Sequence, residues 1–94
     1  MAHACMRLRK LGGKQKRSLR TRLLAGRPFV ECHYCGKRLT MQDMTLDHVH
    51  AWSKGGGNGI SNMLPACQPC NRMKGDMEYA DFIARCRTIA EAAA

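Results

Sequence analysis

The sequence predicts a small α+β domain that is held together by a structural zinc site of four cysteines. The chain has 94 residues, of which 45% are hydrophobic and only 5% aromatic, so its apolar core is thin. Chains of this size usually need a metal, a disulfide or a partner to stay folded. Two Cys-x-x-Cys pairs, Cys32/Cys35 and Cys67/Cys70, supply candidate metal ligands, and short strand-like and helix-like segments surround them.

Basic residues are concentrated at the N-terminus. Nine Lys and Arg residues and no acidic residue lie within the first 30 positions, whereas the later positions carry seven of each sign. We therefore divide the chain into a basic arm, residues 1–27, which is partly helical or disordered, and a neutral domain, residues 28–94. Such an arm favours binding to nucleic acid, through arginines such as Arg17, Arg20 and Arg22. The alternative is a solubilising tail.

The first elements are read from turn signals and composition. Within the arm, the leucine spacing predicts a helix over about 18–25, which Gly26 and Pro28 would end. Residues 29–31 read as a short strand that leads into the first cysteine pair, and residues 44–49 as a second strand. The glycine-rich run 55–59 is predicted to be a loop, because glycine loses the most backbone freedom in regular structure.

Two helices are predicted in the last third of the chain. Pro69 suits the first turn of a helix that Gly75 would close. Asp76 would cap a final helix, which carries one apolar stripe that we expect to pack on the core. The stripe consists of Tyr79, Phe82, Ile83, Cys86 and Ala90.

The cysteine spacing favours a zinc site over the other fates of a thiol. A two-residue gap lets one tight turn present two sulfurs to the same tetrahedral ion, and two such pairs complete a four-sulfur set. Disulfides would need an oxidising compartment, and a redox Cys-x-x-Cys usually occurs singly on a larger fold. A structural zinc ion can contribute on the order of 10 kcal/mol to folding. Cys5 and Cys86 are left over and need no function.

Membrane insertion and secretion are not expected. No stretch approaches the ~20 apolar residues of a membrane span, and the start of the chain lacks the apolar centre of a signal peptide. We expect a cytoplasmic protein.

The segment between and after the cysteine pairs carries several polar motifs in a fixed order. These are Asp-His at 47–48, Ser-Lys-Gly-Gly at 53–56, Asn-x-Leu at 62–64 and Cys-Asn-Arg-x-Lys-Gly at 70–75. Each motif alone is a weak signal. In this order and spacing, the segment from about 32 to 75 resembles the HNH endonucleases, the ββα-metal nucleases.

The resemblance implies a role for each motif residue. His48 would be the general base that takes a proton from the attacking water, and Asp47 and Asn71 would present oxygens to one Mg²⁺ or Mn²⁺ ion. Asn62 would tie the loop and help to orient the base. Asn71 lies where some members of the family carry a last histidine, so the sequence is an H-N-N variant.

Strand geometry leaves one question open. Successive side chains of a regular strand face opposite ways, so His48 and His50 would share a face that Asp47 does not. The strand must therefore twist, bulge or end if Asp47 and His48 serve one site. His50 remains a further candidate metal ligand or phosphate contact, and His33 could in principle replace a cysteine at the zinc.

Further basic residues flank the motifs and could contact phosphate oxygens; these are Lys54, Arg72 and Lys74. The sequence thus predicts a metal-dependent endonuclease that acts on DNA with little sequence preference, in a bacterial or phage-infected cell. One alternative is a zinc-binding DNA module that does not cut. Another is a nuclease subunit that needs a partner protein from a phage-packaging or restriction assembly.

Overall fold

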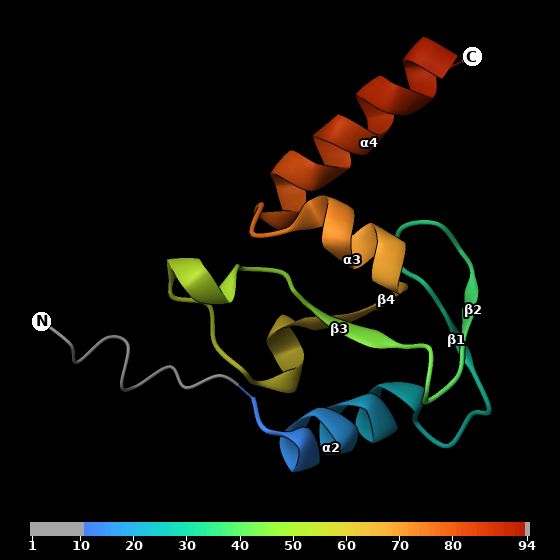
Figure 1. The fold of residues 1–94 in the computed structure, drawn as a ribbon, viewed down its shortest axis with the longest axis vertical. Coiled ribbons are helices and arrows are strands. Elements are labelled where there is room, and N and C mark those ends of the chain that lie inside the picture. The colour runs from blue at the N-terminus through green and yellow to red at the C-terminus, as the bar shows by residue number, and fades with distance from the viewer. Residues whose placement is uncertain (1–10, 94) are drawn as a thin grey trace, which may run out of the picture.

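The computed structural model describes residues 11–93, so Cys5 and the first three basic residues of the arm lie outside the described part. Its centre is an antiparallel pair of strands, β3 (Thr45–His48) and β4 (Met63–Ala66), followed directly by helix α3 (Gln68–Lys74) (Figure 1). In the pairing of the two strands, Thr45 lies opposite Ala66 and His48 opposite Met63. The predicted α+β fold with a ββα centre is confirmed.

A second, smaller antiparallel pair carries the first cysteines. Strand β1 (Val30–Glu31) pairs with β2 (Arg38–Leu39), and the turn between them contains Cys32 and Cys35. The Gly36 N–H donates to the carbonyl of Cys32, and Gly36 has φ +81°, a conformation that favours glycine. The backbone N–H of His33 also donates to the carbonyl of Pro65, which joins this turn to β4.

The core lies where the two pairs of strands meet. Its buried residues include one cysteine of each pair, Cys32 and Cys67. Leu23 and Leu24, at the end of the first helix (residues 13–24), pack against its edge. The cluster consists of Val30, Cys32, Leu39, Met44, Ala66 and Cys67. With so few large apolar side chains, the core is as thin as the composition indicates.

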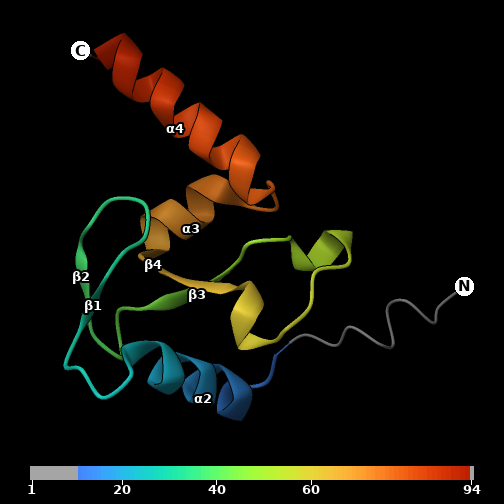
Figure 2. The same cartoon turned by 180° about the vertical axis from the view of Figure 1, so that it is seen from behind.

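Helix α2 (Gly13–Leu24) packs against β3 and β4, on the opposite side of the strand pair from α3 (Figures 1 and 2). It begins five residues before the predicted start. Gly12 caps the helix, and the Gln15 side chain accepts a hydrogen bond from the Gly12 N–H at 2.6 Å. Leu19 is buried beneath the helix, so half of the predicted basic arm belongs to the packed body.

Helix α4 (Tyr79–Ala93) projects away from the ββα unit (Figure 1). Near its start, Phe82 is 1% exposed and meets the Tyr34 ring edge-on at 4.8 Å. Further along, Ala90 is exposed and Ile89 is 50% exposed. The predicted apolar stripe therefore packs only at its N-terminal end.

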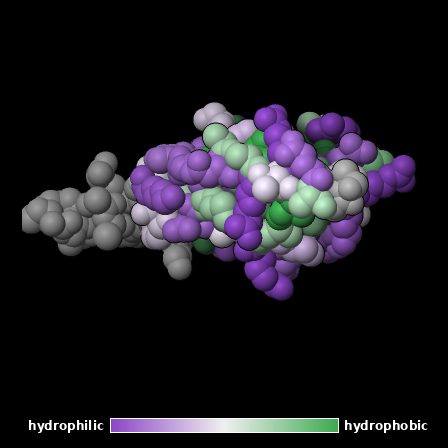
Figure 3. All heavy atoms as spheres, turned by 90° about the horizontal axis from the view of Figure 1, so that it is seen from above, coloured by the Kyte–Doolittle hydropathy of each residue, from purple (hydrophilic) through white to green (hydrophobic). Residues whose placement is uncertain are grey.

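Within residues 11–93, the helices are all too short or too polar to cross a bilayer. Seen from above, this face mixes hydrophilic side chains with apolar patches near its middle (Figure 3).

Candidate active site and metal centre

The four cysteines of the two predicted pairs come together. Their sulfur atoms all lie within 4.8 Å of one another, and the sulfurs of Cys35 and Cys67 are 3.7 Å apart. Sulfurs bound tetrahedrally at 2.3 Å from one zinc ion would be roughly 3.8 Å apart. The cluster could therefore hold zinc with little rearrangement. Its two halves come from the β1–β2 turn and from the start of α3.

Backbone donors act on one of these thiols. Burial opposes ionisation of Cys32, but the N–H groups of Cys67, Cys35 and Tyr34 outweigh it and lower the Cys32 pKa to about 7. Burial raises the pKa of Cys70, and the neighbouring thiols raise it further. Cys32 therefore ionises more readily than an ordinary thiol, and a bound cation would favour the thiolate at all four cysteines.

His33, the alternative ligand, and the left-over Cys86 have other surroundings. The His33 Nε2 lies 2.8 Å from the hydroxyl of Tyr79, so this ring is held by α4. Cys86 lies on α4 and does not belong to the four-sulfur cluster.

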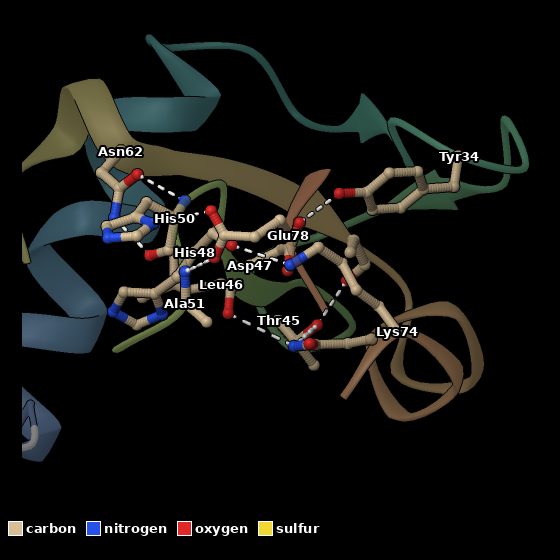
Figure 4. Close-up of polar contacts among 12 residues, drawn as sticks. Tyr34, Thr45, Leu46, Asp47, His48, His50, Ala51, Asn62, Lys74 and Glu78 are labelled. Carbon is tan, nitrogen blue, oxygen red and sulfur yellow. Dashed lines mark hydrogen bonds and ion pairs between the residues drawn. The ribbon is translucent and has the colours of Figure 1, made fainter. Parts of the chain in front are cut away.

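Strand β3 presents its polar residues on two sides, as strand alternation requires. Asp47 is 2% exposed and faces Tyr34 and Lys74, which approach it from the β1–β2 turn and from α3 (Figure 4). The half-buried His48 instead contacts Asn58, in the glycine-rich loop.

The carboxylate of Asp47 is held through both oxygens. Its Oδ2 accepts a hydrogen bond from the Tyr34 hydroxyl, and its Oδ1 lies 3.1 Å from the Lys74 Nζ. Burial raises the pKa of Tyr34, and the hydrogen bond to Asp47 raises it further, so the phenol stays protonated and donates. Lys74 is 1% exposed and also donates to the carbonyl of His48 at 2.8 Å.

The imidazole of His48 is oriented from the glycine-rich loop. Its Nε2 lies 2.9 Å from the Asn58 Oδ1. Since an amide oxygen only accepts hydrogen bonds, this contact places the ring hydrogen on Nε2 and leaves the Nδ1 lone pair as the basic site.

Asn62 closes the same loop. Its amide group donates to the carbonyls of His50 and Gly57 and accepts from the His50 N–H, each at about 3.0 Å (Figure 4). Gly56 passes so close beneath the His50 carbonyl that an added Cβ would lie 1.8 Å from that oxygen. The loop therefore needs both residues to keep its path.

Asn71 lies on α3, over the start of β3. Its amide nitrogen donates to the Thr45 hydroxyl at 2.9 Å and to the Leu46 carbonyl at 3.2 Å. Because the nitrogen makes both bonds, the Oδ1 oxygen is the atom that can act as a ligand. The Asn71 backbone N–H donates to the carbonyl of Cys67, which ties its position to the cysteine cluster.

Two cavities meet at this group of residues. The smaller, of about 220 Å³, is lined by Asp47, His48 and Asn71 together, along with Asp76 and Trp52. The larger, of about 480 Å³, is also lined by His48 and Asn71, and its far wall is α2. The structure thus brings the three predicted residues to one hollow, although Asp47 and His48 leave the strand on different sides.

His50 lies apart from both cavities. Its Nδ1 is 2.7 Å from the Glu78 Oε2, while the other Glu78 oxygen accepts from the Ala51 N–H at 3.1 Å. Two hydrogen bonds lower the pKa of Glu78: the one from His50 has the larger effect, and the one from the Ala51 N–H has the smaller. The contact fastens the loop to the start of α4, and nothing in it indicates a metal or a phosphate.

The predicted DNA-contacting residues fall into three groups. Lys54, Arg72, Arg17 and Arg22 are exposed. Arg20 is half-buried and lines the larger cavity with Lys16. Lys74 corrects the prediction, because its ammonium group is buried against Asp47 and is not offered to a phosphate.

Sequence reasoning missed three residues of the site, namely Tyr34, Asn58 and Glu78. Asn58 is the polar side chain within the glycine run, which was an available signal. Tyr34 and Glu78 act through contacts between segments 13 and 28 residues apart, and no local pattern marks them.

Comparison with known proteins shows what this segment is similar to. Residues 32–77 match the family model described as HNH endonuclease. This segment holds the four cysteines, β3, β4, α3 and the cavity residues Asp47, His48 and Asn71. The match covers just under half of the chain and includes each of the three predicted cavity residues.

A curated relative agrees with this match. The chain is 33% identical over 55 residues to the CRISPR-associated endonuclease Cas9 of Corynebacterium diphtheriae. The matched stretch is 57% of this chain but only 5% of that protein's length.

Proposed function

We propose that the chain is a metal-dependent endonuclease that hydrolyses DNA phosphodiester bonds, with His48 as the general base. One observation carries the proposal: a histidine, a carboxylate and an amide oxygen line the same cavity. The family match and the likeness to a protein named as an endonuclease support it. A module that only bound DNA would have no need of a proton acceptor between two oxygen ligands.

His48 would accept the proton of the attacking water. The contact from Nε2 to Asn58 leaves Nδ1 as the basic nitrogen. Imidazole is suited to this step because its unperturbed pKa lies near neutral pH. Asn62, which fixes the backbone on both sides of His50, would hold the ring at the cavity.

Asp47 and Asn71 would hold the catalytic cation. A carboxylate and an amide oxygen form a hard donor set that suits Mg²⁺ or Mn²⁺. When bound, such an ion stabilises negative charge on the scissile phosphate and on the departing 3′ oxygen. Tyr34 and Lys74 would keep the Asp47 carboxylate in one orientation, since they contact its two oxygens.

The four cysteines would hold zinc in a structural role. The cluster offers four sulfurs and lies in the core, where a closed tetrahedral site contributes to folding rather than to chemistry. By fixing the start of α3 to the β1–β2 turn, zinc would also fix Asn71, which follows Cys70 directly. The structural ion would thus preorganise the catalytic site.

The basic N-terminal segment would supply affinity for the DNA backbone. Four exposed cations lie on α2, namely Lys14, Lys16, Arg17 and Arg22. Contacts between cations and phosphates make binding strongly dependent on salt. We assign these residues to DNA binding and residues 28–94 to the nuclease domain.

A plasmid assay tests the proposal. Purified protein should nick or linearise supercoiled plasmid with Mg²⁺ or Mn²⁺. The cutting should stop when EDTA removes the cation. His48→Ala should keep its zinc content and melting temperature while cutting at least about 100-fold more slowly. His50→Ala is the matched control and should cut at nearly the wild-type rate. Unchanged cutting by pure His48→Ala would remove the assigned base.

A further inference from the structure

One wall of the larger cavity is formed by residues outside the HNH motifs. His48, Thr45 and Asn71 line one side of it, and Lys16 and Arg20 of α2 line the other. Lys16 and Arg20 are four residues apart, so they lie on the same face of the helix. Leu19 is buried beside them and α2 contacts both β3 and β4, which holds this face against the site.

Arg20 has an unmet hydrogen-bonding requirement at this wall. Its Nε is buried and has no hydrogen-bond partner within the described part of the chain. The ion pairs among residues 11–93 are His50–Glu78 and Lys74–Asp47, so no carboxylate there pairs with Arg20. A buried donor without a partner destabilises the fold, and more so when the group is charged. An anion that entered the cavity and accepted hydrogen bonds from this guanidinium group would offset that destabilisation.

A phosphate group is the anion that fits this wall. Guanidinium presents its N–H groups in a planar fork that matches two phosphate oxygens. Arg20 reaches the cavity from the side opposite Asn71, while His48 lines the same hollow. A phosphodiester placed against His48 would therefore also lie against Arg20.

We propose that Arg20 is a catalytic residue that contacts the scissile phosphate and stabilises the charge that develops on it during hydrolysis. This inference rests on the proposed nuclease function and deepens it, because it takes one arginine of the basic segment out of general backbone binding. Arg17 lies on the same helix, is exposed and does not line the cavity. It serves as the comparison for a cation that only attracts DNA.

The two roles separate in kinetics. A contact that strengthens in the transition state raises the rate at saturation, whereas a ground-state contact raises only affinity. Arg20→Met should lower the single-turnover rate on a short labelled duplex, at saturating enzyme, by about 100-fold. Arg17→Met should weaken binding. Arg87→Met, at an exposed position of α4 outside the proposed DNA-binding segment, should leave that rate unchanged. Methionine keeps helix propensity at all three positions.

Two further readouts exclude a structural explanation. Zinc content and melting temperature should match among wild type, Arg20→Met and Arg17→Met. Added guanidinium ion should restore part of the rate to Arg20→Met and none to His48→Ala. DNA affinity, measured by fluorescence anisotropy in the His48→Ala background so that no cutting occurs, should change less than fivefold for Arg20→Met.

The outcomes distinguish this inference from the proposal beneath it. If wild type cuts and Arg20→Met cuts as fast at saturation, Arg20 is only a binding cation and the inference is overturned. The same holds if guanidinium restores nothing to a correctly folded Arg20→Met. If wild type cuts no DNA with any divalent ion tested, the nuclease proposal fails first and the role of Arg20 fails with it.

Discussion

The ammonium group of Lys74 lies 3.1 Å from the carboxylate of Asp47, and the two side chains are 1% and 2% exposed. Asp47 is a candidate ligand of the catalytic cation, and Lys74 also donates to the His48 carbonyl. One buried lysine thus contacts both residues of the Asp-His motif. It takes the place of the surface cation that the sequence predicts.

Removal of this ammonium group should destabilise the fold strongly. Lys74→Met would leave the Asp47 carboxylate buried without its counter-ion, and the loss of one partner of a buried pair costs about 3–5 kcal/mol. The free energy of unfolding, measured by chemical denaturation of the zinc-loaded protein, should fall by that amount. Lys54→Met, which removes an exposed cation, should change it by less than about 0.5 kcal/mol.

A double variant tests the cause of this loss. Lys74→Met combined with Asp47→Leu removes the charge as well as its partner, so the double variant should be more stable than Lys74→Met alone. If Lys74→Met unfolds at the same denaturant concentration as wild type, the pair contributes nothing.

Features of the site that depend on residues close together in the sequence can be predicted from it. Features that depend on how distant segments pack cannot. The four-cysteine cluster is predictable because a tetrahedral ion would impose a short spacing on each cysteine pair. The positions of His48 and Asn71 follow from the order of the motifs. Lys74 was misjudged because its burial depends on how α3 is rotated over β3, and a single lysine in a short helix carries no sign of that rotation.

Helix packing also explains the remaining differences. Arg17 and Arg20 are the same residue type within the same basic segment. Only the packing of α2 against β3 and β4 decides which of them reaches the cavity. The apolar stripe on α4 predicts burial along its length, but the thin core ends near Phe82. A stripe indicates which face is apolar, not how far another element covers it.

Gly56 should not tolerate a side chain. A Cβ there would lie 1.8 Å from the His50 carbonyl oxygen and 2.8 Å from the Ala51 oxygen, so Gly56→Ala must push the loop away from the strand that carries His48. We expect a loss of about 1–3 kcal/mol in the free energy of unfolding and at least a tenfold fall in cutting rate. Gly57→Ala is the matched control, because no atom lies within 4 Å of its added Cβ. Equal stability of the two variants would contradict the close approach.

Loss of one sulfur ligand should release the zinc. Cys67→Ser removes a buried ligand that also lies in the core, and structural zinc supplies much of the folding free energy of a small domain. The variant should bind less than one zinc per chain by elemental analysis and should lose its circular dichroism signal at a lower temperature. Cys86→Ser, outside the cluster, should retain both. A Cys67→Ser protein that kept its zinc and melted like wild type would exclude the four-sulfur site.

The contact between Glu78 and His50 should make part of the stability sensitive to acid. The Glu78 pKa is lowered from its ordinary value of 4.5, so folding favours the carboxylate. This contribution is present above pH 4.5 and is lost as the pH falls through the lower, folded-state value. The stability difference between wild type and Glu78→Gln should therefore be largest near pH 6 and should shrink towards zero near pH 3. A difference that stays constant with pH would assign the effect to shape rather than to charge.

Asn58 should control the pH dependence of cutting through its contact with the His48 Nε2. Asn58→Asp would put a carboxylate beside that nitrogen and stabilise the imidazolium, which cannot act as a base. The acid limb of the pH–rate profile should therefore move to higher pH. Asn58→Ala should lower the rate about tenfold, because the ring loses its orienting partner. Ser61→Ala, at an exposed position of the 3-10 helix Ile60–Asn62 that follows the loop, should match wild type. If the profile of Asn58→Asp superimposed on that of wild type, either His48 would not be the base or Asn58 would not face it during the reaction, and unchanged activity of His48→Ala would identify the first case.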